Sequence, residues 1–226
     1  MKRFSAMFLV LVLLAAAGFT FAEEMEITVL RENYIEYKGY SGMKGEYLAQ
    51  IQNNTSAGYY VYTGTITLLD ADGNALNEKS NFLGGSKYLA PGESSFIRIN
   101  ADIPEGTTVA DYTVDIPPAE KRYTGEDLEL QVDEAVYDPT NESNPQIYIT
   151  VTNPYDEPHY VALVFTVEDA EGNIYYLGQD SYGLDRLGGH STIYTVQAMP
   201  SEIRNYVKDN GITLTQVEVS AFAENK

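Results

Sequence analysis

Apolar and polar residues alternate with a period of two along much of the chain. Ile147, Ile149 and Val151 are separated by polar residues. Four further rows show the same spacing: 62/64/66/68, 112/114/116, 161/163/165/167 and 217/219/221. In a β-strand this spacing turns one face to the core and the other to water, as in antiparallel sheets. The pattern predicts that these rows are the inward faces of strands.

Turn-forming residues separate the predicted strands, at positions 72–74, 84–85, 91–92 and 188–189. Several short strands of this kind in about 100 residues are typical of a β-sandwich. One helix is expected, at residues 201–208. Ser201 is the expected cap, Glu202 favours the positive end of the helix, and Gly211 follows its end.

The chain also matches itself. Residues 65–74 align with 164–173, with Thr67, Asp70, Ala71, Gly73 and Asn74 identical in the partner. Other matches keep the same order: 26–29 with 127–130, 47–53 with 147–153, 88–96 with 186–194, and 111–114 with 216–219. Such order predicts a tandem duplication. We expect an all-β protein of two immunoglobulin-like sandwiches, residues 23–117 and 126–226, joined by a proline-containing linker at 118–125.

The first 22 residues have the features of a signal peptide. Lys2 and Arg3 precede an apolar run over residues 4–18, and Thr20 and Ala22 precede a plausible cleavage point before Glu23. An uncleaved anchor is the alternative, although the run is shorter than the roughly 20 residues of a spanning helix. We expect a secreted, extracellular protein, with the cell wall as a candidate place of attachment and no membrane insertion after cleavage.

Charge and cysteine content narrow the possible partners. The 33 acidic and 14 basic residues give a formal net charge of −19. Such a chain repels nucleic acid, whose binding proteins need basic surfaces, and favours cationic partners. It contains no cysteine, which excludes disulfides, thiol nucleophiles and thiolate metal sites. Its oligomeric state is left open.

A family resemblance emerges from the repeated motifs. Residues 66–70 and 165–169 resemble the signature strand of the FxLYD domain, in which an Asn closes the preceding strand and a Gly-Asn turn follows. Asn53 and the segment 89–96 fit that arrangement in the first copy. The second copy keeps Asn153 but has Gly-Gly-His in place of Pro-Gly-Glu. The resemblance implies small immunoglobulin-like sandwiches in exported proteins of Gram-positive bacteria, with no activity assigned.

Sequence motifs for catalysis are weak. His159 and His190 are the only histidines, and no Gly-x-Ser-x-Gly elbow accompanies them. Among the many acids, no carboxylate pair of the kind used by glycosidases stands out. We therefore expect no enzymatic activity and no cofactor, with an extracellular hydrolase as the third and last functional hypothesis.

One acidic turn resembles part of a calcium loop. Asp70, Asp72 and Asn74 place oxygen-bearing side chains at alternate positions, as calcium ligands are placed. The downstream Glu of an EF-hand is absent at the required spacing. A hairpin turn with Gly73 at a positive φ explains the same residues without a metal, and calcium is kept as the alternative.

Tyrosine is unusually frequent, with 19 residues against no tryptophan. Two loop regions carry the candidate ligand-binding residues: Tyr59, Tyr60 and Tyr62, and Tyr155, His159 and Tyr160. Tyrosines can stack on sugars or line interfaces, although they also fill half-buried strand positions. The leading hypothesis is a binding or adhesion module for a cell-envelope glycan or an extracellular protein. A structural spacer without a ligand is the second.

Overall fold

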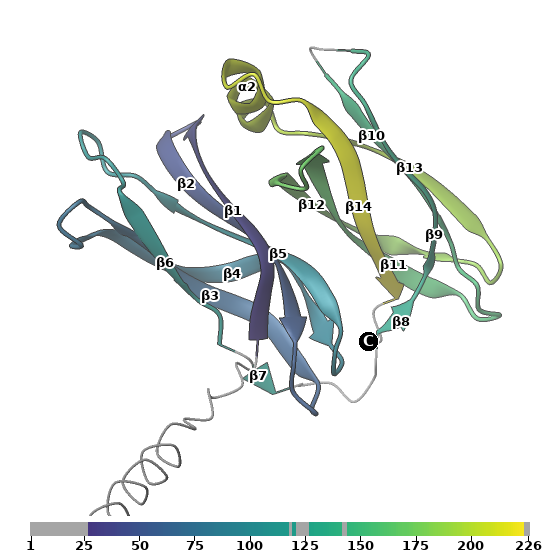
Figure 1. Ribbon diagram of the computed structural model, residues 1–226. Coiled ribbons are helices and arrows are strands. Elements are labelled where there is room, and N and C mark those ends of the chain that lie inside the picture. The colour runs from purple at the N-terminus through teal and green to yellow at the C-terminus, as the bar shows by residue number, and fades with distance from the viewer. Residues whose placement is uncertain (1–26, 118, 121–126, 142–143, 224–226) are drawn as a thin grey trace, which may run out of the picture.

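The structure, a computed structural model, describes residues 27–117, 119–120, 127–141 and 144–223 (Figure 1). The predicted signal peptide at 1–22 and most of the predicted linker lie outside these residues. The described chain consists mostly of antiparallel strands with one short helix, so the predicted all-β fold class is confirmed. Within the described residues, no helix has both the length and the apolar character needed to cross a membrane.

Seven strands form the first half of the molecule. They are β1 (Ile27–Gly39), β2 (Gly42–Asn53), β3 (Tyr59–Leu69), β4 (Ala75–Leu89), β5 (Ser94–Asp102), β6 (Asp111–Asp115) and β7 (Ala119–Glu120). Their order is β1-β2-β5-β4-β3-β6, and β7 pairs with β3. The register links β4 to β5 through a pairing of Gly84 with Arg98. The sheet therefore folds into two layers, β1-β2-β5 and β4-β3-β6.

The second half contains the remaining strands and the helix. These are β8 (Leu128–Glu129), β9 (Gln131–Asp138), β10 (Gln146–Thr152), β11 (His159–Asp169), β12 (Ile174–Leu187), β13 (Thr192–Ala198), α2 (Ser201–Asp209) and β14 (Leu214–Ala223). Strands β13-β10-β9 form one sheet and β12-β11-β14-β8 form the other.

The two halves repeat the same pairing scheme. Counted from β1 and from β9, the first, second and fifth strands form one layer, and the fourth, third and sixth form the other; the short strands β7 and β8 pair with β3 and β14. One irregularity also recurs. The register with the neighbouring strand shifts between Val29 and Arg31 in β1, and it shifts between Val132 and Glu134 in β9. Each shift inserts one extra residue, as a β-bulge does. Arg31 and Glu134 therefore occupy equivalent positions.

The predicted inward rows are largely the buried ones. Ile147, Ile149 and Val151 are fully buried. In the first half the rule fails at one residue, because the register of β3 shifts between Val61 and Thr63. The shift buries Val61 and leaves Tyr62 half-exposed. The prediction that Tyr62 belongs to the inward row is therefore wrong.

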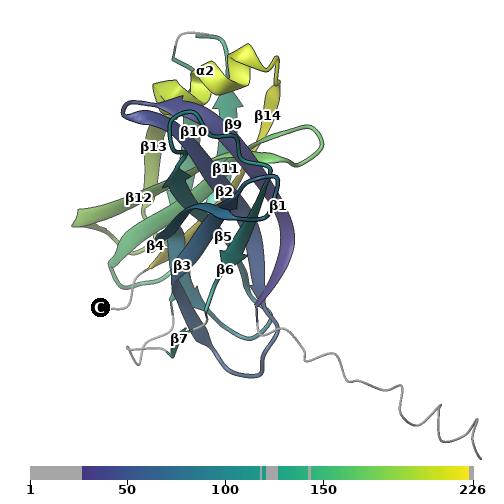
Figure 2. The same ribbon diagram turned by 90° about the vertical axis from the view of Figure 1, so that its left-hand side faces the viewer.

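The four layers stack face to face. The β12-β11-β14 layer lies between β9-β10-β13 and the β1-β2-β5 layer of the first half (Figures 1 and 2). Strand β12 contacts β1, β2, β4 and β5. One buried cluster accordingly includes Ile35, Leu48 and Phe96 of the first half together with the core of the second. The halves lie side by side, and the start of β1 and the end of β14 are at the same end of the molecule (Figure 1).

The predicted helix is confirmed, but its N-terminal cap differs from the prediction. Pro200 occupies the cap position, and no side chain there hydrogen-bonds to the helix. The Ser201 hydroxyl instead donates to the Glu202 carboxylate at 3.0 Å. The C-terminal prediction holds, because Gly211 adopts a φ of 65° and its N–H bonds to the Lys208 carbonyl.

Candidate functional site between the two halves

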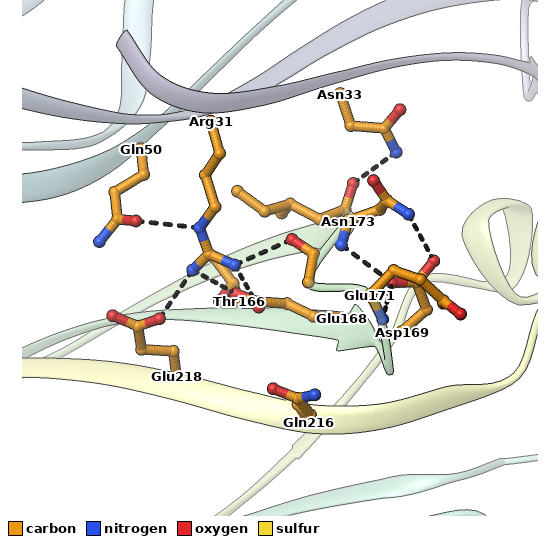
Figure 3. A network of polar contacts seen from close by, with 12 residues as sticks. Arg31, Asn33, Gln50, Thr166, Glu168, Asp169, Glu171, Asn173, Gln216 and Glu218 are labelled. Carbon is orange, nitrogen blue, oxygen red and sulfur yellow. Dashed lines mark hydrogen bonds and ion pairs between the residues drawn. The ribbon is translucent and has the colours of Figure 1, made fainter. Parts of the chain in front are cut away.

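Arg31 forms the centre of a polar network between the two halves (Figure 3). Its two Nη atoms contact the Glu168 carboxylate at 2.5 and 2.9 Å, and Nη2 also lies 2.7 Å from Glu218. On its own half, Arg31 Nε donates to Gln50 at 2.9 Å. This is a forked arrangement, which matches the planar guanidinium to a carboxylate and adds geometric specificity.

The network is partly withdrawn from water. The Glu168 side chain is 3% exposed and the Arg31 side chain 28% exposed. A buried carboxylate is tolerated only when it is paired and hydrogen-bonded. Glu168 meets this requirement through Arg31 and through the Thr166 hydroxyl, which donates at 2.5 Å. The guanidinium also lies over the Phe96 ring, 5.5 Å from its centroid.

Further hydrogen bonds join the halves beside this network. Arg31 Nη1 donates to the Gly172 carbonyl, and Asn33 Nδ2 donates to the Ile174 carbonyl, both at 2.9 Å. The Gly85 N–H donates to Gln179 at 3.1 Å. These contacts fix the β11 and β12 layer against the first half.

A second buried carboxylate, that of Glu46, lies on the same face of β2 as Gln50. Glu46 is 1% exposed and accepts a hydrogen bond from the Tyr37 hydroxyl at 2.6 Å. Its other oxygen lies 3.8 Å from Arg98 and has no hydrogen-bond partner. Burial and the nearby Glu46 charge raise the pKa of Tyr37 well above its ordinary value.

A cleft of about 610 Å³ opens beside the Arg31 network. Both halves line it. Its polar groups include Gln50, Ser94, Glu129, Gln131, Glu218 and Ser220. Tyr155 also lines the cleft, and its hydroxyl donates to the Glu129 carbonyl at 3.1 Å. The cleft is open and mainly polar, and Tyr155 adds an aromatic residue to its hydrogen-bonding groups.

Glu218 belongs to both the network and the cleft. Its side chain is half-exposed. Partial burial is the largest influence and raises the pKa of Glu218, while Arg31 lowers it and Glu168 raises it. The net effect is a pKa above the ordinary Glu value, and this carboxyl binds a proton more readily than a free one.

The predicted tyrosine residues fall into two different environments. Tyr155 lines the cleft, and its ring meets His159 edge-on at 5.6 Å. Tyr160 stacks with Arg186, whose guanidinium lies 4.9 Å from its ring centroid. In the first half, Tyr59, Tyr60 and Tyr62 are half-buried on β3.

The first-half tyrosines pack among themselves rather than in the cleft. Tyr60 lies 5.6 Å from Tyr62, which in turn stacks on Phe82 at 6.4 Å. Of the six predicted residues, only Tyr155 is among those lining the cleft. The sequence did not single out Arg31, Gln50, Glu168 or Glu218. One feature of the sequence could have indicated Glu168: it is a charged residue directly after the apolar run of β11.

The two buried asparagines of the repeated motif have matching roles. Asn53 donates to the Ala57 and Leu89 carbonyls, and Asn153 donates to the Glu157 and Leu187 carbonyls. Each side-chain oxygen accepts the backbone N–H two residues later, that of Thr55 or Tyr155. These bonds hold the loops that lead into β3 and β11.

The acidic turn at Asp70 is held by its own backbone. Asp70 Oδ1 accepts the N–H groups of Asp72 and Asn74 at 2.9 and 2.8 Å, and Gly73 has a φ of 80°. Hydrogen bonds from Asn74 lower the pKa of Asp70. Asp169 repeats this geometry in the second half. In the described parts of the chain, no group of three or more acidic or histidine side chains is placed to hold a metal.

His190 lies in the turn after β12, but His159 is the first residue of β11. The prediction that His159 lies in a loop is therefore wrong, as it is for Tyr59, Tyr60, Tyr62 and Tyr160, which lie on β3 and β11. His190 has a φ of 54° and its Nε2 lies 2.7 Å from Asp156, with both side chains largely exposed. His159 contacts the Tyr155 ring.

No family model and no curated protein matches the sequence. Among solved structures, the chain is similar to red sea bream transglutaminase, with 9% identity and a TM-score of 0.26. The alignment covers 100% of this chain and 34% of that one, so the chain spans about a third of its length. A similarity at this level carries no argument about function.

Proposed function

We propose that the chain is an exported, non-enzymatic binding protein that recognises a cell-envelope glycan or an extracellular protein in the cleft between its halves. In this proposal the halves are tandem immunoglobulin-like domains of the FxLYD type, and residues 1–22 are a signal peptide. The repeated strand order and the bulge shared by β1 and β9 support a tandem origin.

The observation that carries the proposal is the cleft itself. It brings the Tyr155 ring beside amide, hydroxyl and carboxylate groups from β2, β5, β9 and β14. Tyrosine stacks on the apolar faces of sugars, and these polar groups match sugar hydroxyls. A spacer is supported less well, because side-by-side packing gains little length from the second half (Figure 1).

The test is co-sedimentation of residues 23–226 with insoluble cell-wall material. We expect retention of the wild type, and a loss of most retention in Tyr155→Ala. Tyr40→Ala is the matched control, because Tyr40 is fully exposed at the β1–β2 turn and is not among the cleft residues. Equal retention of the two variants would contradict a site at Tyr155.

An extracellular hydrolase is the second candidate, and one observation favours it. Glu129 and Glu218 line the same cleft, and the pKa of Glu218 is raised, as that of a glycosidase general acid is. Release of reducing sugar from cell-wall glycan, abolished in Glu218→Gln, would favour this candidate. Sedimentation without release would favour the binding protein.

A further inference from the structure

The outer face of the β9-β10-β13 sheet is uncovered and partly apolar (Figure 1). Val136 and Val196 are 42% and 45% exposed, and Tyr194 is 58% exposed. The Tyr194 ring lies 5.9 Å from the ring of Tyr148, with an interplanar angle of 15°. An exposed group of apolar and aromatic side chains is typical of an interaction surface.

The outer face of β9-β10-β13 is equivalent to the face of β1-β2-β5 that packs against the second half. In the first half, strand register aligns Arg31 with Gln50 and Phe96, and that row packs against the second half. In the second half, the corresponding row is Glu134, Thr150 and Tyr194, and the neighbouring row is Val136, Tyr148 and Val196. The same layer of the sandwich is thus covered in one half and open in the other.

The two faces differ in charge at the equivalent position. Arg31 of the covered face meets the carboxylates of Glu168 and Glu218. At the corresponding point the open face has Glu134. Strands β9, β10 and β13 contain the acids Asp133, Glu134 and Asp138, and they contain no lysine or arginine. The open face is therefore acidic, and it favours a partner whose surface is positively charged.

We propose that this open face docks a basic protein surface. An arginine or lysine of the partner lies against Glu134 and over the Tyr148 and Tyr194 rings, while apolar groups cover Val136 and Val196. Cation–π contact and charge complementarity then act at the same place. A second copy fits poorly, because the opposite outer face carries Glu78, Asp111 and Asp115, and like charges repel.

The test measures binding of an oligo-arginine peptide to residues 23–226 by NMR titration. We expect the largest shift changes on the outward residues of β9, β10 and β13. Glu134→Lys should weaken binding about tenfold, and Tyr194→Ala should weaken it by a similar factor. Glu78→Lys is the matched control: it makes the same charge change on the opposite outer face and should weaken binding less than about twofold.

Three outcomes would overturn the proposal. Equal losses in Glu134→Lys and Glu78→Lys would mean that the peptide senses net charge alone. Unchanged binding in Tyr194→Ala with preserved folding, judged from the NMR spectrum, would remove the aromatic contact. Concentration-dependent self-association that Glu134→Lys abolishes would assign the face to a second copy of the chain. None of these outcomes depends on the cleft at Tyr155, so the two proposals fail separately.

Discussion

Strands β3 and β11 hold the same place in their sheets but are buried to different extents. Along β3, burial alternates, and Thr65 and Thr67 face outward. Along β11, all residues from Val161 to Asp169 are buried. One face of β11 packs into its own sandwich, and the other, with Val164 and Thr166, faces the first half.

The difference teaches how a sandwich face becomes an interface. Thr65 of β3 corresponds to Val164 of β11, and Leu69 corresponds to Glu168. Apolar residues on both faces are typical of a strand covered on both sides. The added charge at Glu168 selects one orientation, because Arg31 satisfies it only in this packing.

The largest expected effect comes from placing a charge on the covered face. Val164→Asp should lower the free energy of unfolding by about 3–5 kcal/mol, because the new carboxylate is buried without a partner. Thr65→Asp should cost less than about 1 kcal/mol, mostly through repulsion from the paired Asp115. Urea unfolding measures both. Similar losses would mean that the two strands are equally exposed. Small-angle scattering of Val164→Asp would show whether the halves separate instead of unfolding.

Removing one partner of the interface ion pair should have a smaller effect. Glu168→Ala leaves Arg31 without its most buried contact and should cost about 2–3 kcal/mol. Asp102→Ala removes an exposed pair with Lys44 and should cost less than about 1 kcal/mol. Thermal unfolding of both variants at low and high salt gives the comparison. If Glu168→Ala lowered the stability as little as Asp102→Ala does, with the same dependence on salt, the Arg31 network would behave as an exposed ion pair and not as a buried one.

The equivalent acidic turns should differ more modestly. Asp169 is 7% exposed and accepts two backbone N–H groups, so Asp169→Ala should cost about 1–2 kcal/mol. Asp70→Ala should cost less, because its turn is more exposed. Asp72→Ala should change stability by less than about 0.5 kcal/mol. Calcium and a chelator should give the same values. A calcium-dependent stability that Asp72→Ala removes would restore the calcium loop.

The smallest effect should be a change in pH dependence at Glu218. Its pKa is raised in the folded protein, so the fold gains stability as the pH falls through the folded value towards the unfolded value of 4.5. Glu218→Gln lacks this gain. The difference in melting temperature between variant and wild type should therefore favour the variant most at pH 7, and should shrink by pH 4.5. Parallel melting curves across this range would contradict the raised pKa.

The sequence predicted much of the fold because strand alternation and turn chemistry act locally. One predicted turn is wrong, because Gly84 and Gly85 lie within β4 and do not separate two strands. The rows at 147–151 and 161–167, and the matching positions of Asn53 and Asn153, could be predicted from neighbouring residues alone. Tyr62 could not, since a one-residue bulge reverses every side chain beyond it. Ser201 was predicted as the helix cap because serine is common there, but Pro200 occupies the cap position.

Most of the candidate site could not be predicted from the sequence, for a different reason. Arg31 and Glu168 lie 137 residues apart in the chain, and they meet because the two halves pack together. Their spacing along the chain gives no periodic signal. Tyr155 was found because aromatic residues in loops are conspicuous, but the groups that share its cleft come from four separate strands.

The short connection between the halves changes what their interface must achieve. Only residues 121–127 separate β7 from β8, so each half meets the other at an effective concentration in the millimolar range. An interface with an intrinsic dissociation constant of about 0.1 mM would then be closed in about nine molecules of ten. A modest set of polar contacts beside the shared apolar cluster is enough under these conditions. Substitutions in them change the fraction of time spent closed and leave the two halves on one chain.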